Sequence, residues 1–220
     1  MYAPPLSRWS DHDELVEAIA RLRFATLVTH IDGRYFASPV PMVVRRDGDE
    51  VFLETHLARA NPHSSIFTGA EAGGAKPSIA IFQGPDAYIS PSYYPSKAEH
   101  GKVVPTWTYT AVQAEGPVSA LSDRKTLLAH LGALTDANEA NRERPWSVSD
   151  APADFIDKLT RSIVGLSMHV TRLDGAQKLN QHKPDADRAG AMTHLSGSTR
   201  PGEAAVSELM SEVERLRGQL

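Results

Sequence analysis

Alternation of apolar and polar residues predicts strands in the first quarter of the chain. Residues 24–30, 35–46 and 50–56 have this pattern, and Asp-Gly pairs at 32–33 and 47–48 separate them. Asp-Gly between two alternating stretches is a strong signal for a two-residue hairpin turn. The sequence therefore predicts an antiparallel meander of three strands.

Four more stretches alternate in the same way, at residues 77–83, 86–90, 107–121 and 164–173. Gly84-Pro85 is expected to break the first two of these strands apart, because both residue types punctuate regular structure. The whole chain is thus expected to contain about seven strands.

Apolar residues three or four positions apart predict three helices in the body of the chain. The first begins after Ser10, and the other two lie at residues 122–140 and 152–163. The later two interrupt the strands and are expected to be amphipathic covers on a barrel. A chain that is mostly antiparallel β with added helices favours a barrel or a curved sheet over a doubly wound α/β sheet.

The last part of the chain has a different pattern. Residues 193–202 are polar and contain Gly, Ser and Pro, which indicates a linker after a domain of residues 1–192. An amphipathic helix is predicted over residues 203–220 from an apolar stripe at spacings of three and four, formed by Val206, Leu209, Val213, Leu216 and Leu220. We expect this helix to dock on the body of its own or a partner subunit, because two heptads are too few for a stable isolated coiled coil.

Composition restricts the classes of function. The net charge of −4 argues against a broad nucleic-acid-binding face, although a local basic patch is compatible with it. The absence of cysteine excludes disulfides, zinc-thiolate sites, iron–sulfur clusters and thiol catalysis. Acidic residues interrupt any apolar run near the N-terminus, and no stretch reaches transmembrane length. We therefore expect a cytoplasmic protein that does not enter a membrane.

The first candidate site is the segment 54–65, where a predicted strand ends. It contains His56, Arg59, Asn61 and His63 within a few residues. The guanidinium of Arg59 could bind an anionic group such as a phosphate, with hydroxyl and backbone N–H groups around it. A solvated loop explains the composition equally well, and the histidines lack a zinc signature, so no metal site is expected.

The second candidate is the connection at residues 89–109, which combines prolines, tyrosines, a tryptophan and lysines. Connections of about twenty residues inside a compact domain are uncommon and tend to be functional. A planar aromatic cofactor with an anionic tail would use both the rings and the charges of Lys97 and Lys102. An aromatic cluster that seals one end of a barrel is the alternative.

The third candidate, residues 177–183, contains Lys178, Gln181, His182 and Lys183. The amide of Gln181 can donate and accept hydrogen bonds, which suits the edge of a heterocycle, although a solvated basic turn has the same composition. The sequence contains no P-loop, glycine-rich dinucleotide turn, nucleophile elbow or catalytic triad.

Several longer motifs, in their order and spacing, resemble the PaiB family of FMN-binding negative transcriptional regulators. The resemblance covers residues 1 to about 195. It rests on HLARANP at 56–62, IFQGPDAYISPSYYPSK at 81–97, GKVVPTWTY at 101–109, PWSV at 145–148, IVGLSMHVTRLDGAQKLNQHK at 163–183 and DRAG at 187–190. Two positions depart from the family pattern: Tyr93-Tyr94 stands where relatives have Trp-Tyr, and residues 180–182 read Asn-Gln-His where relatives end Ser-Gln-Asn.

The resemblance implies a split β-barrel like that of pyridoxamine-phosphate oxidase and the flavin reductases. It also implies a homodimer with FMN in the cleft between subunits. Arg59 is then expected to bind the FMN phosphate, and the strand around Val40 and Met42 to line the isoalloxazine ring. The full set of residues expected at the cofactor is His56, Ala58, Arg59, Asn61, Val40, Met42, Lys102, Thr106, Trp107, Lys178 and Gln181.

Three functions are compatible with this resemblance. The first is a negative transcriptional regulator, which in the best-known relative represses sporulation and protease genes. The second is a flavin-dependent oxidoreductase or flavin reductase, in which the cofactor supplies the hydride chemistry. The third is a sensor that binds flavin without turnover. Direct DNA binding has weak support, because the sequence contains neither a recognisable helix-turn-helix nor a basic stripe.

Overall fold

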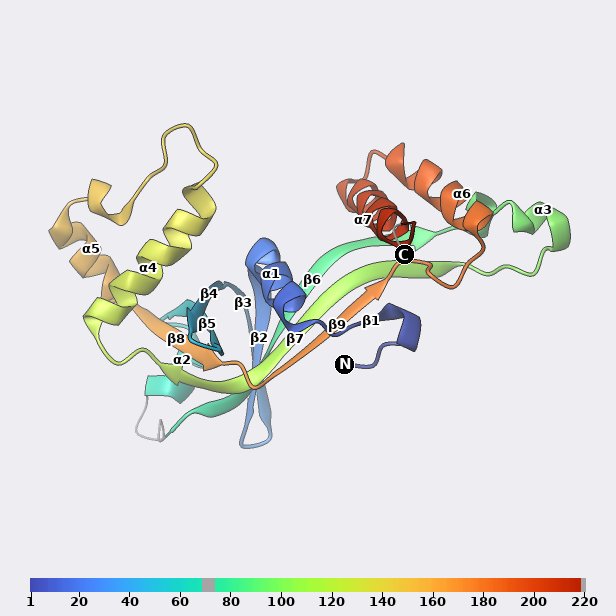
Figure 1. The fold of residues 1–220 in the computed structure, drawn as a ribbon. Helices are drawn as coiled ribbons and strands as arrows, with labels where there is room; N and C mark the ends of the chain where they lie inside the picture. The colour runs from blue at the N-terminus through green and yellow to red at the C-terminus, as the bar shows by residue number, and fades with distance from the viewer. Residues whose placement is uncertain (69–73, 219–220) are drawn as a thin grey trace. The chain divides into compact units, whose positions relative to one another are not determined.

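The computed structural model describes residues 1–68 and 74–218 of the chain. The chain divides into two compact units. The sheet unit comprises His12–Phe82 and Gln113–Leu173. The terminal unit comprises Met1–Asp11, Gln83–Val112 and Asp174–Leu220. Two long strands, β6 and β7, contribute residues to both units, as Figure 1 allows the reader to follow along the chain.

Seven strands build the sheet of the sheet unit, in the spatial order β3-β2-β6-β7-β8-β5-β4. Their bounds are Phe24–Ile31 for β2, Arg34–Pro41 for β3, Val43–Asp47 for β4, Glu50–Ala58 for β5, Lys76–Ile89 for β6, Thr106–Ala120 for β7 and Ile163–His169 for β8. The pairs β2–β3, β2–β6, β4–β5, β5–β8 and β7–β8 are all antiparallel. The expected antiparallel, mostly β architecture is confirmed.

Tight turns set the register of the first strands, as their Asp-Gly pairs predict. Asp32 and Gly33 have φ angles of 48° and 73°, which are the left-handed values that the two central residues of a type I′ turn require. The turn pairs Ile31 with Arg34 and, further along, Leu27 with Ser38. Gly48 has a φ of 59° in the second hairpin, between β4 and β5. Both predicted hairpins are therefore confirmed. The three-strand meander is wrong in its middle strand, because residues 35–46 form two strands, β3 and β4, at opposite ends of the strand order.

Two further strand predictions are wrong. Gly84-Pro85 does not break a strand, because β6 runs through both residues. A Cβ at Gly84 would lie 2.0 Å from Oγ1 of Thr110, so glycine here permits a close strand approach. The predicted strand 164–173 ends at His169 instead. Its last two residues belong to the next strand, β9 at Arg172–Lys178, which pairs with β7 as β8 does but has β1 at Arg8–Trp9 in place of β5.

Helices of the sheet unit cover its strands. They are α1 at His12–Leu22, α2 at Pro62–Thr68, α4 at Arg124–Glu139 and α5 at Ala153–Thr160, with a 3₁₀ turn, η3, at Val148–Asp150. Helix α1 buries Leu15 and Ile19 as its spacing predicts. Helix α2 was not predicted, although Asn61-Pro62 is a cap followed by a first-turn proline. The core also contains Leu27, Val40, Met42, Leu53, Phe82, Leu166 and Met168.

The terminal unit contains both chain ends and a second hydrophobic core. Its remaining elements are η1 at Pro5–Ser7, β1 at Arg8–Trp9, η2 at Pro91–Tyr93, α3 at Ser96–His100, β9 at Arg172–Lys178, α6 at Asp185–Ser196 and α7 at Pro201–Arg217. Strand β9 pairs with β1 and β7, which brings the described residues to nine strands where about seven were expected. Buried residues of this second core are Ala87, Ile89, Tyr94, Leu179, Ala191, Leu195, Val206 and Met210.

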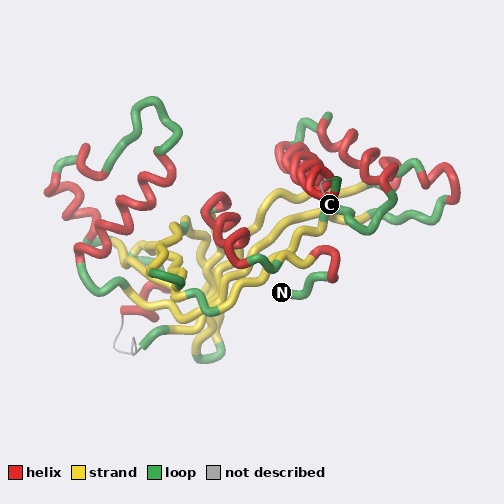
Figure 2. Tube along the Cα trace, viewed as in Figure 1, coloured by secondary structure: helices red, strands yellow, loops and turns green. Residues whose placement is uncertain are grey.

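Helices α6 and α7 lie side by side in the terminal unit (Figure 2). Residues 197–200 connect them, and Ser207 Oγ donates to Met192 O at 3.0 Å between them. On the predicted stripe of α7, Val206 is buried while Leu216 is 50% exposed; Leu220 lies outside the described residues. The helix thus packs on its own chain through its first turns.

Candidate functional site

The end of β5 places Arg59 on the turn between α5 and β8. The Arg59 N–H bonds to Ser162 O at 2.7 Å. The exposed guanidinium donates from Nε to Arg161 O at 3.1 Å and from Nη2 to Ile163 O at 3.2 Å. A guanidinium has five N–H donors, so these two bonds orient the group and leave donors for a ligand.

Asn61 joins the first candidate segment to β3. Its Oδ1 accepts from the His63 N–H at 2.9 Å, and its Nδ2 donates to Ser38 Oγ at 3.1 Å. The neighbouring Ala58 is exposed at the end of β5. Asn61 therefore caps α2 and ties that helix to the sheet at the same time.

A chain of hydrogen bonds with one direction runs from Asn61 through His63. The Ser78 hydroxyl donates to Lys76 O, so it must accept from Thr29 Oγ1 at 2.7 Å. Thr29 in turn accepts from His63 Nε2 at 3.0 Å, and His63 Nδ1 accepts from Ser38 Oγ at 3.0 Å. The imidazole is therefore neutral and protonated at Nε2. Burial lowers the pKa of His63 to about 4, which agrees with this assignment.

His56 forms a second polar cluster with Glu54 and with His130, which the sequence did not single out. His56 Nδ1 lies 3.1 Å from His130 Nε2, and His130 Nδ1 lies 4.0 Å from Glu54 Oε2. Burial, and next the neighbouring His56, lower the pKa of His130 to about 4; burial also lowers the pKa of His56. Gly165, the strand partner of His56, lets α4 approach because a Cβ there would lie within 3 Å of Leu121 and Leu127.

Val40 and Met42 contribute their side chains to the core, where they are 1% and 2% exposed. The Met42 N–H is also used, since it bonds to Arg23 O at 2.6 Å. The side chains of Val40 and Met42 and the Met42 N–H are therefore not free for a flavin ring. A ring that binds along this strand would contact other backbone groups close to these two residues.

In the terminal unit, two expected residues from distant segments touch. Lys178 Nζ donates to Thr106 Oγ1 at 2.9 Å, which links β9 to β7. Trp107 is 54% exposed, and its ring meets the edge of Tyr88 at a centroid distance of 5.9 Å. Lys102 is also exposed, and its N–H bonds to His100 Nδ1. This unit therefore presents exposed rings and a lysine on the motif 101–109.

Gln181 lies in the turn that follows β9. Its Oε1 accepts from the Leu179 N–H at 2.8 Å, and its Nε2 donates to Gln177 O. Both ends of the amide are therefore used inside the turn after β9. Asn180 lies next to it with a φ of 61°, and its Nδ2 donates to the Tyr94 hydroxyl at 3.1 Å. The amides of this motif organise the turn.

The motifs SPSYYPSK and DRAG are packed together. Asp187 accepts from both the N–H and the hydroxyl of Ser96, at 3.1 and 2.7 Å. A Cβ at Gly190 would lie 2.2 Å from Tyr93 O, so only glycine allows this approach. A cavity of about 510 Å³ lies here, and one wall is the stacked pair of Tyr93 and His194. The DRAG motif is thus explained by the packing of α6 on this segment.

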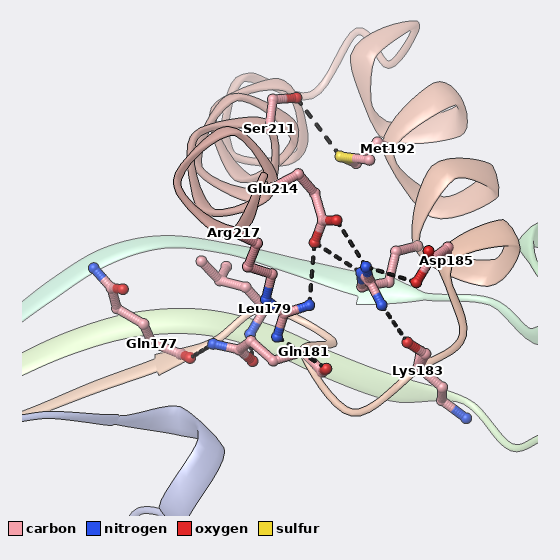
Figure 3. A network of polar contacts seen from close by, with 10 residues as sticks. Gln177, Leu179, Gln181, Lys183, Asp185, Met192, Ser211, Glu214 and Arg217 are labelled. Carbon is pink, nitrogen blue, oxygen red and sulfur yellow. Dashed lines mark hydrogen bonds and ion pairs between the residues drawn. The ribbon is translucent and has the colours of Figure 1, made fainter. Parts of the chain in front are cut away.

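Arg188 of α6 and Glu214 of α7 connect the two helices, and Figure 3 shows Glu214 within this network of polar contacts. Two nitrogens of Arg188 donate to the two carboxylate oxygens of Glu214, each at 2.7 Å, and Nη1 donates to Lys183 O at 2.5 Å. Arg217 Nη2 donates to Gln181 O at 3.0 Å. The hydrogen bond from Arg188, opposed by desolvation, lowers the pKa of Glu214. The last helix therefore holds the turn at residues 177–183.

The expected cofactor residues divide between the two units. The sheet unit contains Val40, Met42, His56, Ala58, Arg59 and Asn61, whereas the terminal unit contains Lys102, Thr106, Trp107, Lys178 and Gln181. Within the described part of the chain, no group of three or more His, Asp or Glu side chains could hold a metal ion. None of the helices described is both long and apolar enough to span a membrane.

A family model described as "Putative FMN-binding domain" matches residues 1–172. The chain belongs to this family. The match confirms FMN as the cofactor expected from the motifs.

Two relatives extend the comparison along the chain. The protease synthase and sporulation protein PAI 2 of Bacillus subtilis is 27% identical over 212 residues, which cover 96% of this chain and 97% of that protein. An uncharacterized protein of Emericella nidulans is 30% identical over 189 residues, which cover 76% of this chain and 74% of that protein. The resemblance to the PaiB family is confirmed.

Solved structures show the same fold at low sequence identity. The FAD and heme binding protein from Mycobacterium smegmatis has a TM-score of 0.56 at 17% identity, covering 83% of this chain and 79% of that one. The flavocytochrome Anf3 from Azotobacter vinelandii has a TM-score of 0.52 at 18% identity, covering 83% and 74%. The split β-barrel fold is thus confirmed.

Proposed function

We propose that this protein is an FMN-binding homodimer that acts as a negative transcriptional regulator of the PaiB type. The observation that carries the proposal is the match to PAI 2, which spans nearly the whole length of both chains. PAI 2 is named for protease synthesis and sporulation. Because it matches this chain over nearly its whole length, its name supports the proposed regulatory function.

Arg59 is the proposed ligand of the FMN phosphate, with His56, Ala58 and Asn61 as its neighbours. Its guanidinium is oriented by two backbone carbonyl groups and keeps further N–H donors, which fits a group that only accepts hydrogen bonds. From the family motifs we also propose Lys102, Thr106, Trp107, Lys178 and Gln181 as contacts of FMN. When bound, FMN would supply hydride and electron transfer, while these residues bind and orient it.

The proposed homodimer has a candidate interface on α5. Phe155 and Leu159 lie one helical turn apart on this short helix and are 52% and 48% exposed. The leucines of α4 are only half-buried. Exposed apolar residues grouped in this way are typical of surfaces that associate. We propose that a second copy of this chain covers these residues, because the proposed FMN cleft lies between two subunits.

A flavin-dependent oxidoreductase is the second candidate, and the histidine pair favours it. Their nearest ring nitrogens lie 3.1 Å apart, and burial lowers the pKa of both His56 and His130, so the rings are neutral at physiological pH and able to donate and accept hydrogen bonds. The net charge of −4 argues against direct contact with DNA. A regulator of this kind could therefore act through a partner.

Three measurements on the purified protein test these functions. An absorbance spectrum after incubation with FMN should contain protein-bound flavin bands, and their absence contradicts both candidates. Mobility shifts of promoter DNA that persist at physiological salt favour a regulator that contacts DNA. Bleaching of the flavin by NAD(P)H without such shifts favours the oxidoreductase.

A further inference from the structure

Glu54, His56 and His130 form a line of polar side chains under α4. Glu54 and His56 lie two residues apart on β5, so both point to the same face of the sheet, and His130 reaches them from α4. The His130 ring is fully buried and the His56 ring is half-buried. Of the two rings, only that of His56 is placed to meet a bound molecule.

Arg45 fixes the carboxylate at one end of this line. Its Nε donates to Glu54 Oε1 at 2.6 Å, and its guanidinium also lies over the Phe52 ring at 4.1 Å. The other oxygen, Oε2, lies on the side of His130. The carboxylate therefore has one oxygen for Arg45 and one for the imidazole.

The protonation of both rings follows from this order. His130 Nδ1 is buried without a hydrogen-bond partner in the described structure, and Glu54 Oε2 is 4.0 Å away. A lone pair facing a carboxylate oxygen would be repelled, so the proton of His130 belongs on Nδ1. His130 Nε2 is then the acceptor, and His56 Nδ1 must donate to it across 3.1 Å. This leaves His56 Nε2 as an unprotonated acceptor.

We propose that Glu54 and His130 are positioning residues that hold His56 as a hydrogen-bond acceptor for bound flavin. The acceptor takes a donor group of the cofactor, either the N–H of the isoalloxazine ring or a ribityl hydroxyl. It does not bind the phosphate, whose oxygens offer no proton to the lone pair. The inference rests on the proposed FMN binding, and it separates the role of His56 from that of Arg59.

Nitrogen NMR of histidine-labelled protein tests the tautomer without any flavin. In the wild type, His56 should carry its proton on Nδ1. In Glu54→Gln, Arg45 still donates to the oxygen of the new amide, so the NH₂ group faces His130 Nδ1. His130 should then carry its proton on Nε2 and donate to His56 Nδ1, which moves the proton of His56 to Nε2. Glu50→Gln is the matched control, because exposed Glu50 lies on the same strand and pairs with His169 instead. Its His56 tautomer should stay as in the wild type.

A wild-type His56 protonated at Nε2 overturns the inference, and this result does not depend on the folding of any variant. An unchanged tautomer in folded Glu54→Gln also overturns it. If the wild type binds no flavin, the proposed function fails, while the NMR measurement still decides the tautomer.

Titrations with FMN and riboflavin test which part of the cofactor His56 meets. Riboflavin has the ring and the ribityl chain but no phosphate. Glu54→Gln should weaken binding of both flavins by the same factor, about tenfold for one lost hydrogen bond. Glu50→Gln should change neither affinity. Weakening confined to FMN would place His56 at the phosphate and overturn the assignment.

Discussion

At the scale of single residues, the guanidinium of Arg59 offers the sharpest test of the cofactor site. We expect Arg59→Ala to weaken FMN binding about 10- to 100-fold, because it removes a charge-assisted contact to phosphate. Riboflavin binding should be nearly unchanged. Arg161→Ala is a suitable control, since Arg161 is exposed and supplies only its carbonyl group to Arg59. Fluorescence titration of both flavins measures the effect, and equal affinities of wild type and Arg59→Ala for FMN would exclude the assignment.

Residue types in the motifs were readable from the sequence, but their partners were not. The late motif offered the amide of Gln181 for the edge of a heterocycle or for a solvated turn, and the fold directs both ends of that amide to backbone groups of the same turn. His130, which lies between leucines on α4, was not identified from the sequence. The spacing of apolar residues predicts the helix, but it does not show which distant residue a polar side chain on that helix contacts. Glu54 and His130 are 76 residues apart, so only folding could reveal them as neighbours.

At the scale of elements, α7 is held by one buried arginine. Glu214→Gln should lower the free energy of unfolding by about 2 kcal/mol, because largely buried Arg188 would lose its bidentate charged partner and keep only the ion pair with exposed Asp185. Glu212→Gln is the control on the same helix. Its pair with Arg215 is 3.9 Å long and well exposed, so about 0.5 kcal/mol or less is expected. Urea denaturation measures the stability of both variants. Equal losses of stability would show that the ion pair between Arg188 and Glu214 does not stabilise the fold.

The hairpins and the amphipathic helix α1 were predictable because their signals are local. The Asp-Gly turns need left-handed backbone angles, which are a property of those residues themselves. Strand β6 was predicted as two strands, because Gly84-Pro85 looks like a break unless the closeness of Thr110 is known. The exchange of β5 for β1 as a neighbour after β8 likewise depends on strands that are far away in the sequence.

At the scale of the whole molecule, buried histidines make stability depend on pH. The pKa values of His63 and His130 are about 4 in the folded protein, against an ordinary value of 6.5. Between these values the unfolded chain binds more protons, so stability is full above pH 6.5 and falls as the pH drops toward 4. The slope is at most about 1.4 kcal/mol per pH unit for each histidine.

Urea denaturation at a series of pH values from 7 to 4 measures this dependence. A variant that lacks one of the two imidazoles, His130→Gln, should lose stability about half as steeply over the same range. Stability that stays level below pH 6.5 in the wild type would contradict the neutral, buried state of both rings.

Assembly is the other property of the whole molecule that can be tested. Introducing a charge on the apolar face of α5, as in Phe155→Asp, should shift the protein from dimer to monomer, because a buried unpaired charge is costly at an interface. Lys158→Asp changes an exposed position of the same helix and should leave the dimer intact. Light scattering after size-exclusion chromatography gives the mass, and a wild-type monomer would refute the homodimer.

The sequence by itself determined the family, the cofactor, the antiparallel class of the sheet and the local turns. These follow from motif order and from the backbone preferences of neighbouring residues. Only the tertiary structure decided which polar groups meet. It places the proton of His63 on Nε2 through a buried chain of hydrogen bonds, and it brings His56 next to His130. It also directs both ends of the Gln181 amide to backbone groups of the same turn. Hydrogen bonds and burial join residues that are distant in the chain, and no local pattern encodes those distances.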